Sequence, residues 1–530
     1  MTEMKHGVAA ATESVYVVPR EVSGEAITRS LQALLPTRHH AIARHRFTVL
    51  DTFDERVRRA GARLTRGGAD DSTVAWQTRG TSSHLKVRLK QPANFAWDFP
   101  TGRLQQTLAS VIGPRRLLEQ ADAEEYGSLL EVLDDRGKTV ARLRIASGQA
   151  RLPSPRAAWR PLPTMVTLTA LRGYEDTYSR LVPVIESRPG VQPCPEGSLD
   201  VMLSGAGAPM RGDVSSPRVD LASTVRADIG ARQIHLALVG ILEANEPGLR
   251  ANLDTEFLHD FRVTVRRTRS LLGQIRRVFP AEAVEHFSTE FSWIGRLTGA
   301  PRDLDVLVLA LRERGAEFSA ADMQVLREIL TQAQQQEHDR LIEALDSQRY
   351  RRLISDWKAF LQRPVLTTPE AVNAGDRLAH VVARRAWRLS QRIADTARII
   401  DGQTSAARLH EIRIDAKKLR YLIDVTPAFC DAADLGCVVG AVKKLQRVLG
   451  DFNDAEVQEK RLLNCGLELG AAGGPPGALL ALGRLVEQSC QRRERLRDEV
   501  VATLERFRAP ETRTACRRAF RRSKSEERAR

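Results

Sequence analysis

The hydrophobic pattern of this chain changes period near residue 200, and this change constrains the fold more than any other feature. Before it, short segments rich in β-branched residues alternate apolar and polar side chains, as in HLKVRLK at residues 84–90. Such alternation is typical of strands with one buried face. After it, apolar residues recur every three or four positions, as in residues 224–245, which is typical of amphipathic helices. We therefore predict an α+β chain in which a strand-rich domain precedes an all-α domain.

The predicted boundary lies at residues 187–218, a segment rich in Gly, Pro and Ser with little periodic hydrophobicity. That composition is typical of a connector between domains. The strand-rich part indicates an antiparallel sheet, or a barrel of the same strands, with added helices. The predicted organisation is a strand-rich domain at residues 1–190, a linker at 191–220, a helical domain at 221–508 and a basic tail at 509–530.

The helical part contains an internal repeat. Residues 258–272 (LHDFRVTVRRTRSLL) align without a gap with residues 409–423 (LHEIRIDAKKLRYLI), at an offset of 151 positions (409 minus 258). The same offset aligns residues 296–306 with residues 447–457. A register shared over this length indicates two copies of one helical unit, packed as a pseudo-dimer.

Each copy places a cationic stripe beside an apolar stripe on one helix. The cationic stripes comprise His259, Arg262, Arg266 and Arg269 in the first copy and His410, Arg413, Lys417 and Arg420 in the second. The predicted core faces comprise Phe261, Val265, Thr268 and Leu272, and Ile412, Ala416, Leu419 and Ile423. Like charges at this spacing repel, which a soluble helix usually relieves with interspersed acids. A solvated helix face is the plain alternative, but the repetition of the stripe with its leading histidine favours an anionic ligand.

The overall charge also favours an anionic partner. Lys and Arg number 81 against 66 Asp and Glu, a formal net charge of +15, which suggests a polyanion or an acidic surface. Aromatic residues are only 5% of the chain, and stacking on aromatic side chains is how single-stranded nucleic acids are usually held. The wider set of candidate binding residues adds Arg267, Arg296, Arg385, Arg388, Lys418, Lys444 and Arg447.

These motifs resemble those of the CHAD family, which is named for a conserved histidine and an all-α domain. The resemblance covers about residues 221–508 and rests on LHDFRVTVRRTR, LHEIRIDAKKLR, LTGAPRDLDV and KKLQRVLGDFND. In that family, two four-helix units surround a basic groove or pore that binds inorganic polyphosphate. The resemblance implies polyphosphate binding by both stripes together with Arg296, Lys444 and Arg447, and association with polyphosphate granules. Asp303 and Asp454 would cap helices or orient the basic residues.

Residues 15–190 resemble, through weaker motifs, the CYTH or triphosphate-tunnel family. HRFTVLDTFDERVRRAGARL is similar to the family's YFDT-type strand and the short basic helix after it. Members that hydrolyse triphosphates carry an N-terminal ExExK motif and late-strand carboxylates that bind a divalent metal. Here the start is SVYVVPREV, and Thr167 and Thr169 stand where the carboxylates are expected. Because Mg²⁺ then has few anchors, we expect a degenerate domain without catalysis.

The basic residues of the strand-rich part leave two interpretations open, a phosphate-binding lining or surface charges on a structural barrel. They are Arg46, Arg58, Arg59, Arg63, Lys86, Arg88 and Lys90.

Three alternative functions stay open. A metal site at His259 and His410 would lie among arginines that repel a cation, and no HxxxH pair supports it. A nucleic-acid binder fits the charge but shows no helix-turn-helix, zinc-finger or RNP signature. A metal-dependent triphosphatase or polyphosphatase in the first domain would need the missing carboxylates.

Several absences complete the prediction. No segment of the sequence is apolar enough to span a membrane, the start does not look like a signal peptide, and the six cysteines form no CxxC pair. We therefore expect a cytoplasmic protein with no membrane partner, no sequence-specific nucleic acid, no metal and no cofactor.

Overall fold

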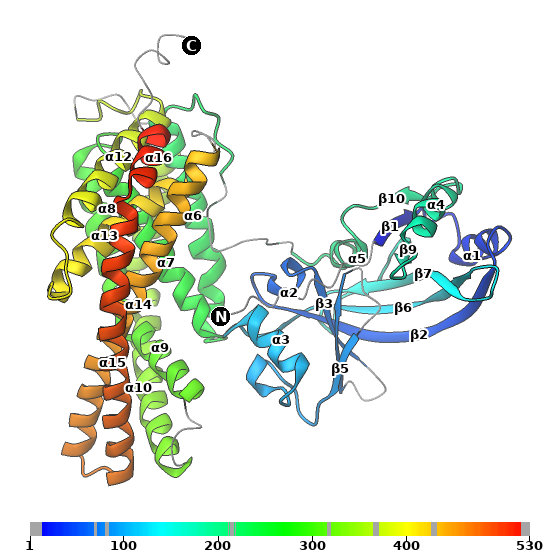
Figure 1. Cartoon of the computed structure of the whole chain (residues 1–530), viewed down its shortest axis with the longest axis horizontal. Helices are drawn as coiled ribbons and strands as arrows, with labels where there is room; N and C mark the ends of the chain where they lie inside the picture. The colour runs from blue at the N-terminus through cyan, green and yellow to red at the C-terminus, as the bar shows by residue number, and fades with distance from the viewer. Residues whose placement is uncertain are drawn as a thin grey trace. The chain divides into compact units, whose positions relative to one another are not determined.

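The computed structural model describes residues 13–67, 72–79, 84–209, 211, 217, 219–314, 320–363, 370–425 and 432–520. The chain divides into two compact units, Met1–Val214 and Ser215–Arg530 (Figure 1). The first unit is built on an antiparallel sheet and the second on helices. The predicted α+β class, with the strand-rich unit first, is confirmed.

The sheet unit holds one ten-stranded sheet in which all neighbouring strands are antiparallel. Its strand order is β10-β1-β9-β7-β6-β2-β3-β4-β5, and β8 pairs with β7 off this path. The strands are β1 (Glu13–Val18), β2 (Thr37–Asp51), β3 (Ala62–Gly67), β4 (Thr73–Thr78), β5 (His84–Arg88), β6 (Leu118–Leu133), β7 (Thr139–Arg151), β8 (Arg160–Pro161), β9 (Thr164–Ala170) and β10 (Gln192–Pro193).

Helices cover both faces of this sheet. They are α1 (Gly24–Gln32), α2 (Arg56–Arg59), α3 (Arg103–Ile112), α4 (Glu175–Glu186) and α5 (Ser198–Ala206), with a 3₁₀ turn η1 (Ala96–Asp98). Leu50 of β2 packs in a core with α3, whereas the next residue back, Val49, packs in a core with α5. Because successive strand residues point to opposite faces, α3 and α5 lie on opposite sides of the sheet. A third core joins α1 and α4 to β1, β6, β7 and β9.

The sheet is open in its hydrogen bonding but strongly curled. Five strand-to-strand steps separate β5 from β7, which amounts to about 24 Å in a flat sheet. Burial, and then the positive charges of Lys86, Arg63 and Arg144, lower the pKa of His84 on β5. Since Arg144 lies on β7, the sheet must bend to bring its edge strand near that residue. The barrel-like expectation is therefore corrected to a curled, unclosed sheet, in which β10 and β5 form the two ends of the strand order.

The unit boundaries differ from the expected ones in two places. The segment expected to be a linker contains β10 and α5, because Met202 and Leu203 of α5 are buried against the sheet. The segment expected to be a tail begins with α16 (Pro510–Phe520), whose Cys516 and Phe520 are buried. The many arginines of α16 make the segment look like a basic tail, although its apolar residues repeat at helical spacing. Residues 521–530 of the expected tail, and 210, 212–216 and 218 of the expected linker, lie outside the described residues.

The helical unit repeats one arrangement twice. Its helices are α6 (Ala227–Arg250), α7 (Thr255–Gln274), α8 (Ala281–Leu297), α9 (Gly299–Arg314), α10 (Ala320–Asp346), α11 (Gln348–Gln362), α12 (Leu378–Thr396), α13 (Ala406–Asp424), α14 (Ala432–Ala471), α15 (Pro476–Arg508) and α16. The starts of α6, α7 and α8 precede those of α12, α13 and α14 by the same 151 positions. Where α8 and α9 are separate in the first copy, α14 runs on as one helix in the second.

Backbone contacts between the copies follow a pseudo-twofold axis. The backbone N–H of Ala227 donates to the carbonyl of Asp376, and that of Leu378 donates to the carbonyl of Val225. Ala227 and Leu378 are equivalent in the repeat, as are Val225 and Asp376, so the two bonds are reciprocal. Such reciprocity is what a twofold interface between like copies requires.

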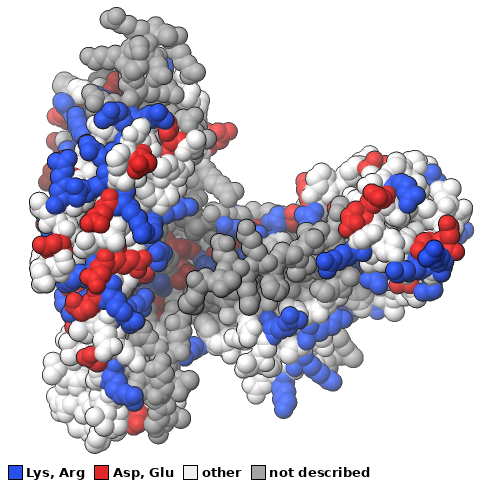
Figure 2. All heavy atoms as spheres, in the orientation of Figure 1, with Lys and Arg blue, Asp and Glu red and all other residues white. Residues whose placement is uncertain are grey.

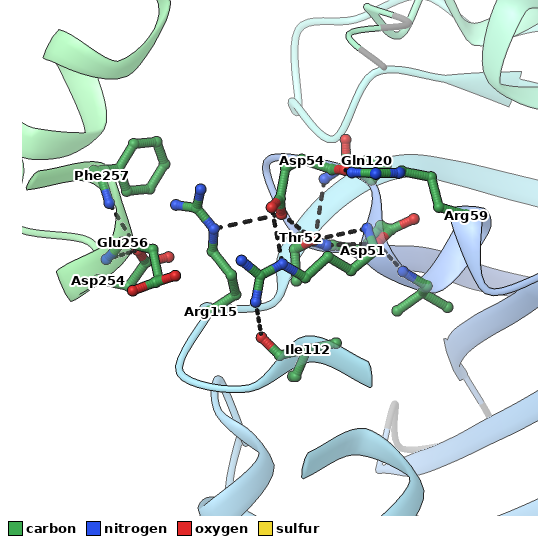
Figure 3. Close-up of polar contacts among 12 residues, drawn as sticks. Asp51, Thr52, Asp54, Arg59, Ile112, Arg115, Gln120, Asp254, Glu256 and Phe257 are labelled. Atoms are coloured by element: carbon green, nitrogen blue, oxygen red, sulfur yellow. Dashed lines mark hydrogen bonds and ion pairs between the residues drawn. The ribbon is translucent and has the colours of Figure 1, made fainter. Parts of the chain in front are cut away.

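The two helices that carry the cationic stripes begin at equivalent capping residues. Asp254 accepts hydrogen bonds from the backbone N–H groups of Glu256 and Phe257 at the start of α7 (Figure 3). Ser405 accepts from the backbone N–H of Arg408 at the start of α13. A side-chain cap satisfies N–H groups that lack an intrahelical partner, so both stripes start in the same register. Among the described residues, no helix is both long enough and apolar enough to cross a bilayer.

Candidate functional site

The two stripe helices, α7 and α13, pack against one another in the helical unit. Their predicted core faces are all buried: Phe261, Val265, Thr268 and Leu272 on α7, and Ile412, Ala416, Leu419 and Ile423 on α13. Because these faces are buried in the core, each cationic stripe must lie beside the core face of its helix. The packing of α7 against α13 then determines which cations of the two stripes lie close together.

Four of the predicted cations come together where the two helices meet. Burial, followed by the charges of Arg413, Arg266 and Arg262, lowers the pKa of Lys417 from 10.5 to about 7. Burial and the charge of Arg266 likewise lower the pKa of Arg262 to about 10. We call Arg262, Arg266, Arg413 and Lys417 the central cluster. In the repeat, Arg262 is equivalent to Arg413 and Arg266 to Lys417, so each copy supplies one pair.

Two acids at equivalent positions flank the central cluster. Asp454 lies 3.8 Å from the guanidinium of Arg413, and the charge of Asp303 acts on Arg262. Helix α14 runs without a break through Asp454, so this residue orients a cation and does not cap a helix. Asp303 forms an ion pair of 3.0 Å with Arg461 of α14. Of the two roles expected for these acids, the structure favours orientation.

The guanidinium of Arg262 is held in place by the junction between α8 and α9. Its Nη1 donates to the carbonyl of Gly295 at 2.8 Å and to Oγ1 of Thr298 at 3.1 Å. Carbonyls at a helix end lack intrahelical donors, so a side chain can satisfy them. Arg262 is thus both a member of the central cluster and a tie between α7 and the end of α8.

Four other predicted cations, Arg267, Lys418, Arg420 and Arg447, pair with acids. Asp424 pairs with Arg420 at 2.7 Å and with Arg267 at 3.8 Å, and Arg267 also lies over the ring of Tyr421. Lys418 pairs with Asp415 at 3.6 Å. Further along α14, Arg447 pairs with Glu499 of α15 at 3.1 Å, whereas Lys444 is exposed on the same helix. These residues contribute little excess charge to the centre.

Two further groups of arginines lie close enough to lower the pKa values of their own members. Burial and the charges of Arg296 and Arg266 lower the pKa of Arg269, which links α8 to the first-copy stripe. On α12, burial and then the charges of Arg276 and Arg392 lower the pKa of Arg385. Arg385 and its neighbour Arg388 were predicted, whereas Arg276, which follows α7, was not among the predicted residues. Its signal was the run Arg276-Arg277 directly after the stripe.

The two leading histidines have different surroundings. Nδ1 of His410 lies 3.0 Å from Oδ1 of Asn453, whereas His259 is half-buried. The residue equivalent to Asn453 is Arg302, which donates to the carbonyl of Thr255. In the described part of the chain, no group of three or more His, Cys, Asp or Glu side chains could hold a metal ion.

A further histidine, His235, was not among the predicted site residues. His235 of α6 is fully buried, and burial lowers its pKa to about 3. Its ring packs edge-on against Trp357 at 5.2 Å, and neither ring nitrogen has a hydrogen-bond partner among the described residues. Its surroundings in the sequence, IHLALVG, are those of a core position. His235 is therefore a neutral core residue, apart from the cationic site.

Basic residues of the sheet unit fall on two faces, and Arg46, Arg58 and Arg63 pair with acids. Arg63, Lys86 and Arg88 share the face covered by α5, and Arg46 lies on the other. On the α5 face, Glu125 of β6 lies 2.6 Å from Arg144 and 3.6 Å from Arg63. The remaining candidates are Arg58, which pairs with Glu55 and Asp200, and the exposed Arg59 and Lys90.

The carboxylates of β6 were not predicted, because the expected metal-binding acids belong to the late strand. Burial raises the pKa of Glu125, but the charges of Arg63 and Arg144 outweigh it and lower the value to about 2. On the other face, Glu124 accepts from Arg46 and from Gln149. Both carboxylates already have cationic or amide partners within the unit.

The DTFDERVRR segment forms a buried polar network (Figure 3). Asp51 accepts from the backbone N–H groups of Val57 and Arg58, which anchors the short helix α2. Oγ1 of Thr52 donates to Asp54 at 2.7 Å, and Asp54 also pairs with the fully buried Arg115 at 3.4 Å. The carboxylates of this motif therefore hold the turn between β2 and α2.

Acids and bases mix on the visible surface of the helical unit, where Figure 2 shows red side chains among the blue ones. This view agrees with the many ion pairs described above. The number of basic residues on the surface therefore does not locate an anion site. The lowered pKa values of the cations at the α7–α13 contact are the better guide.

Residues 233–463 match the family model of the CHAD domain. The helical unit therefore contains a CHAD domain, as its motifs predicted. Over 259 residues the chain is 28% identical to uncharacterized proteins from two Mycobacterium tuberculosis strains, CDC 1551 and H37Rv. The match covers 47% of this chain and 48% of each relative, so the chain spans about half the length of the curated relatives it matches.

Two solved structures are similar to the chain. One is the crystal structure of the CHAD domain from the plant Ricinus communis, with 24% identity and a TM-score of 0.47 over 55% of this chain and 96% of that one. The other is PptA from Streptomyces chartreusis, with 16% identity and a TM-score of 0.42 over 53% of this chain and 100% of that one.

Proposed function

We propose that the helical unit binds inorganic polyphosphate at the central cluster, between its two repeats. The proposal is supported by the gathering of Arg262, Arg266, Arg413 and Lys417 where α7 meets α13, because burial and then the charges of the neighbouring arginines lower the pKa of Lys417 to about 7. Holding like charges together at a half-buried place costs free energy, and such perturbed groups concentrate at functional sites. A bound polyanion would remove that cost.

The chemistry of the cluster suits a chain of phosphates. Three guanidinium groups can each grip phosphate oxygens through two N–H donors, and the lysine adds a compact charge. Arg266 and Arg413 act on the nearby Tyr421, and Arg267 already lies over the ring of this residue. Because an arginine already lies over this ring, the cluster favours polyphosphate over single-stranded nucleic acid. Polyphosphate is also the ligand that the CHAD resemblance implies.

The outer arginines give the proposed ligand a longer track. Arg269 and Arg296 extend the centre along the first copy, and Arg276, Arg385 and Arg388 add positive charge beside α12. A flexible polyanion that contacts several of these cations releases counterions on binding. We therefore expect the affinity to fall steeply as the salt concentration rises.

The test compares cations of the central cluster with paired cations on the same helices. One variant combines Arg266→Gln, Arg413→Gln and Lys417→Gln, and it leaves Arg262 because that residue ties α7 to α8. The matched control combines Arg267→Gln, Lys418→Gln and Arg420→Gln, which pair with Asp424 or Asp415. Titration with polyphosphate should show a loss of about 100-fold or more in the first variant and about threefold in the control.

Circular dichroism of both variants shows whether the bundle is intact. Equal losses of affinity in the two folded variants would refute the assignment of the site. Duplex DNA serves as a competitor, because a site suited to a thin chain should release polyphosphate only weakly to it. In cells, the tagged wild-type chain should colocalise with polyphosphate granules and the first variant should not.

For the sheet unit we propose no hydrolysis of triphosphates. Thr167 and Thr169 of β9 face Arg144 and Arg142 of β7 in the register of the sheet, and neither can supply a carboxylate. Glu125 is already held between two arginines. Incubation of the full chain with a triphosphate and Mg²⁺ or Mn²⁺ should release no phosphate above the uncatalysed rate, and metal-dependent release would contradict this proposal.

A further inference from the structure

We propose that His235 makes the helical unit sensitive to acid, because the aromatic core around this histidine accepts only the uncharged ring. In this view, mild acid shifts the helical unit towards a state in which α6 has separated from that core. The inference concerns a conformational device of the fold, and it does not depend on the proposed function.

The ring of His235 lies inside a cluster of aromatic side chains. Its centroid is 5.2 Å from the Trp357 ring on α11, which it meets edge-on, and 6.2 Å from the Phe279 ring. The Trp357 ring in turn lies 4.5 Å from Phe287 and 5.7 Å from Phe291, both on α8. His235 and Trp357 are fully buried. The cluster therefore joins α6, α8 and α11 around an imidazole that has no contact with solvent.

The imidazole has no polar partner in this cluster. Neither Nδ1 nor Nε2 of His235 forms a hydrogen bond within the described part of the chain, and Nε1 of Trp357 has no acceptor there either. A charged imidazole carries two N–H donors, and burying such a cation without acceptors costs far more free energy than burying the neutral ring. Attraction to an aromatic face offsets only part of that cost. The packing of the cluster thus excludes the charged form.

Charged side chains on the surrounding elements do not compensate for a proton on His235. Burial alone lowers the pKa of His235 to about 3. Before Phe279 in the sequence, Arg276 and Arg277 are exposed to solvent, as is Asp356 before Trp357. Other charged groups of these elements pair with one another: Arg232 with Asp228 on α6, Lys358 of α11 with Glu243 of α6, Arg349 of α11 with Glu290 of α8, Arg267 of α7 with Asp424, and Arg384 of α12 with Asp376.

Acid favours the state in which this core is open. Once α6 separates from the cluster, the His235 ring meets water and regains its ordinary pKa of 6.5, whereas the folded value is about 3. The folded form stays neutral while the open form takes up a proton, so stability is complete above pH 6.5 and is lost as the pH falls below it. The equilibrium constant for opening should rise about 30-fold between about pH 7.5 and pH 5 through this residue.

Hydrogen exchange of the full chain tests the inference, because it reports on α6 separately from the sheet unit. Exchange is followed by peptide mass spectrometry at about pH 7.5 and pH 5 and is corrected for the intrinsic rate at each pH. In the wild-type chain, the opening constant of α6 and α11 should rise about 30-fold or more. In His235→Leu, which keeps an apolar side chain of similar size in the core, the rise should be about threefold or less.

The matched control is His286→Gln. His286 contacts the same cluster through Phe287, with ring centroids 4.9 Å apart, but it is exposed on α8. A charge on an exposed ring stays in water, so the control should keep the full rise of about 30-fold in the opening constant. A rise that disappears in both variants would mean that the cluster responds to the loss of either histidine, which would overturn the assignment to His235.

A second measurement needs no folded variant at position 235. Carbon-13 NMR of labelled histidine rings in the wild-type chain should show one ring that stays neutral down to about pH 5 while α6 is still protected from exchange. Two results would overturn the inference. One is an equal acid response of hydrogen exchange in the wild-type chain and in folded His235→Leu. The other is protonation of every histidine ring above about pH 5 in the folded chain.

Discussion

The central cluster of the helical unit and the Arg63–Glu125–Arg144 group of the sheet unit are both partly buried charge clusters, and they differ in whether the cations have an acid between them. In the sheet, two arginines enclose one carboxylate and lower its pKa to about 2. Between α7 and α13, burial and like charges lower the pKa of Lys417 to about 7. The first arrangement stabilises the charges it contains, whereas the second opposes them. The direction of the pKa shifts therefore separates a structural ion pair from a candidate anion site.

The same distinction holds within the helical unit. Arg420 belongs to the stripe of α13, yet its partner Asp424 lies one turn away on the same helix. Arg413, two turns earlier, meets cations of the other copy. The function of a basic residue in this fold thus depends on which neighbours the pseudo-twofold axis brings to it.

The largest expected effect concerns the Arg63–Glu125–Arg144 group of the sheet unit. Glu125→Gln leaves Arg63 and Arg144 half-buried without their acid, and breaking such a pair typically costs about 3–5 kcal/mol of unfolding free energy. Urea denaturation of the full chain measures this loss. The control is Glu119→Gln, whose exposed pair with Arg66 should be worth less than about 1 kcal/mol.

The pH dependence of the same group follows from its pKa. The folded value of about 2 lies below the ordinary 4.5, so the stabilisation is complete above about pH 4.5. It is lost as the pH falls towards 2. Similar destabilisation by Glu125→Gln and Glu119→Gln would contradict the view that this cluster is structural.

The second prediction concerns the central cluster, where we expect a substitution to raise the unfolding free energy and not to lower it. Lys417→Met keeps the length and apolar stem of the side chain and removes the charge. We expect the helical unit to gain about 1–2 kcal/mol of stability while its affinity for polyphosphate falls about tenfold. Thermal unfolding and titration of the same preparation measure both quantities. A loss of stability would mean that Lys417 serves the fold.

Much of this arrangement could be predicted from the sequence because the repeat supplied long-range information. The gapless alignment of residues 258–272 with 409–423 fixed both stripes and both core faces, and all eight core residues are buried. Local pairs were also accessible in principle, since Arg420 and Asp424 are four residues apart on one helix.

The sequence could not show which charged residues become neighbours only when the chain is folded. Glu125 lies about 60 residues from Arg63, and the curl of the sheet joins them with Arg144. Likewise, Arg266 acts on Lys417 only because equivalent helices meet at the pseudo-twofold axis. Helix α16 was missed for another reason, because its arginines masked the spacing of Cys516 and Phe520.

The third prediction uses pH to sharpen the comparison. The folded pKa of Lys417 is lowered from 10.5 to about 7, so above pH 7 the free protein loses a proton that the bound polyanion would retain. Affinity should therefore fall about tenfold, or about 1.4 kcal/mol, between about pH 6.5 and pH 8.5. Titrations at both pH values measure this, and Lys417→Arg should give a flat response. An equally steep response in Lys417→Arg would assign the pH dependence to another group.

The smallest expected effect concerns the acids beside the centre. Asp454 lies 3.8 Å from Arg413 and is mostly exposed, so Asp454→Asn should leave stability unchanged within about 0.5 kcal/mol. Because one negative charge leaves the neighbourhood of Arg413 and Lys417, affinity for polyphosphate should rise about two- to fivefold. The control is Asp451→Asn on the same helix, whose partner Arg447 also pairs with Glu499. Equal gains in affinity from both variants would show that polyphosphate responds to the total charge of the protein. A gain in affinity from Asp454→Asn alone would indicate that polyphosphate binds next to Arg413.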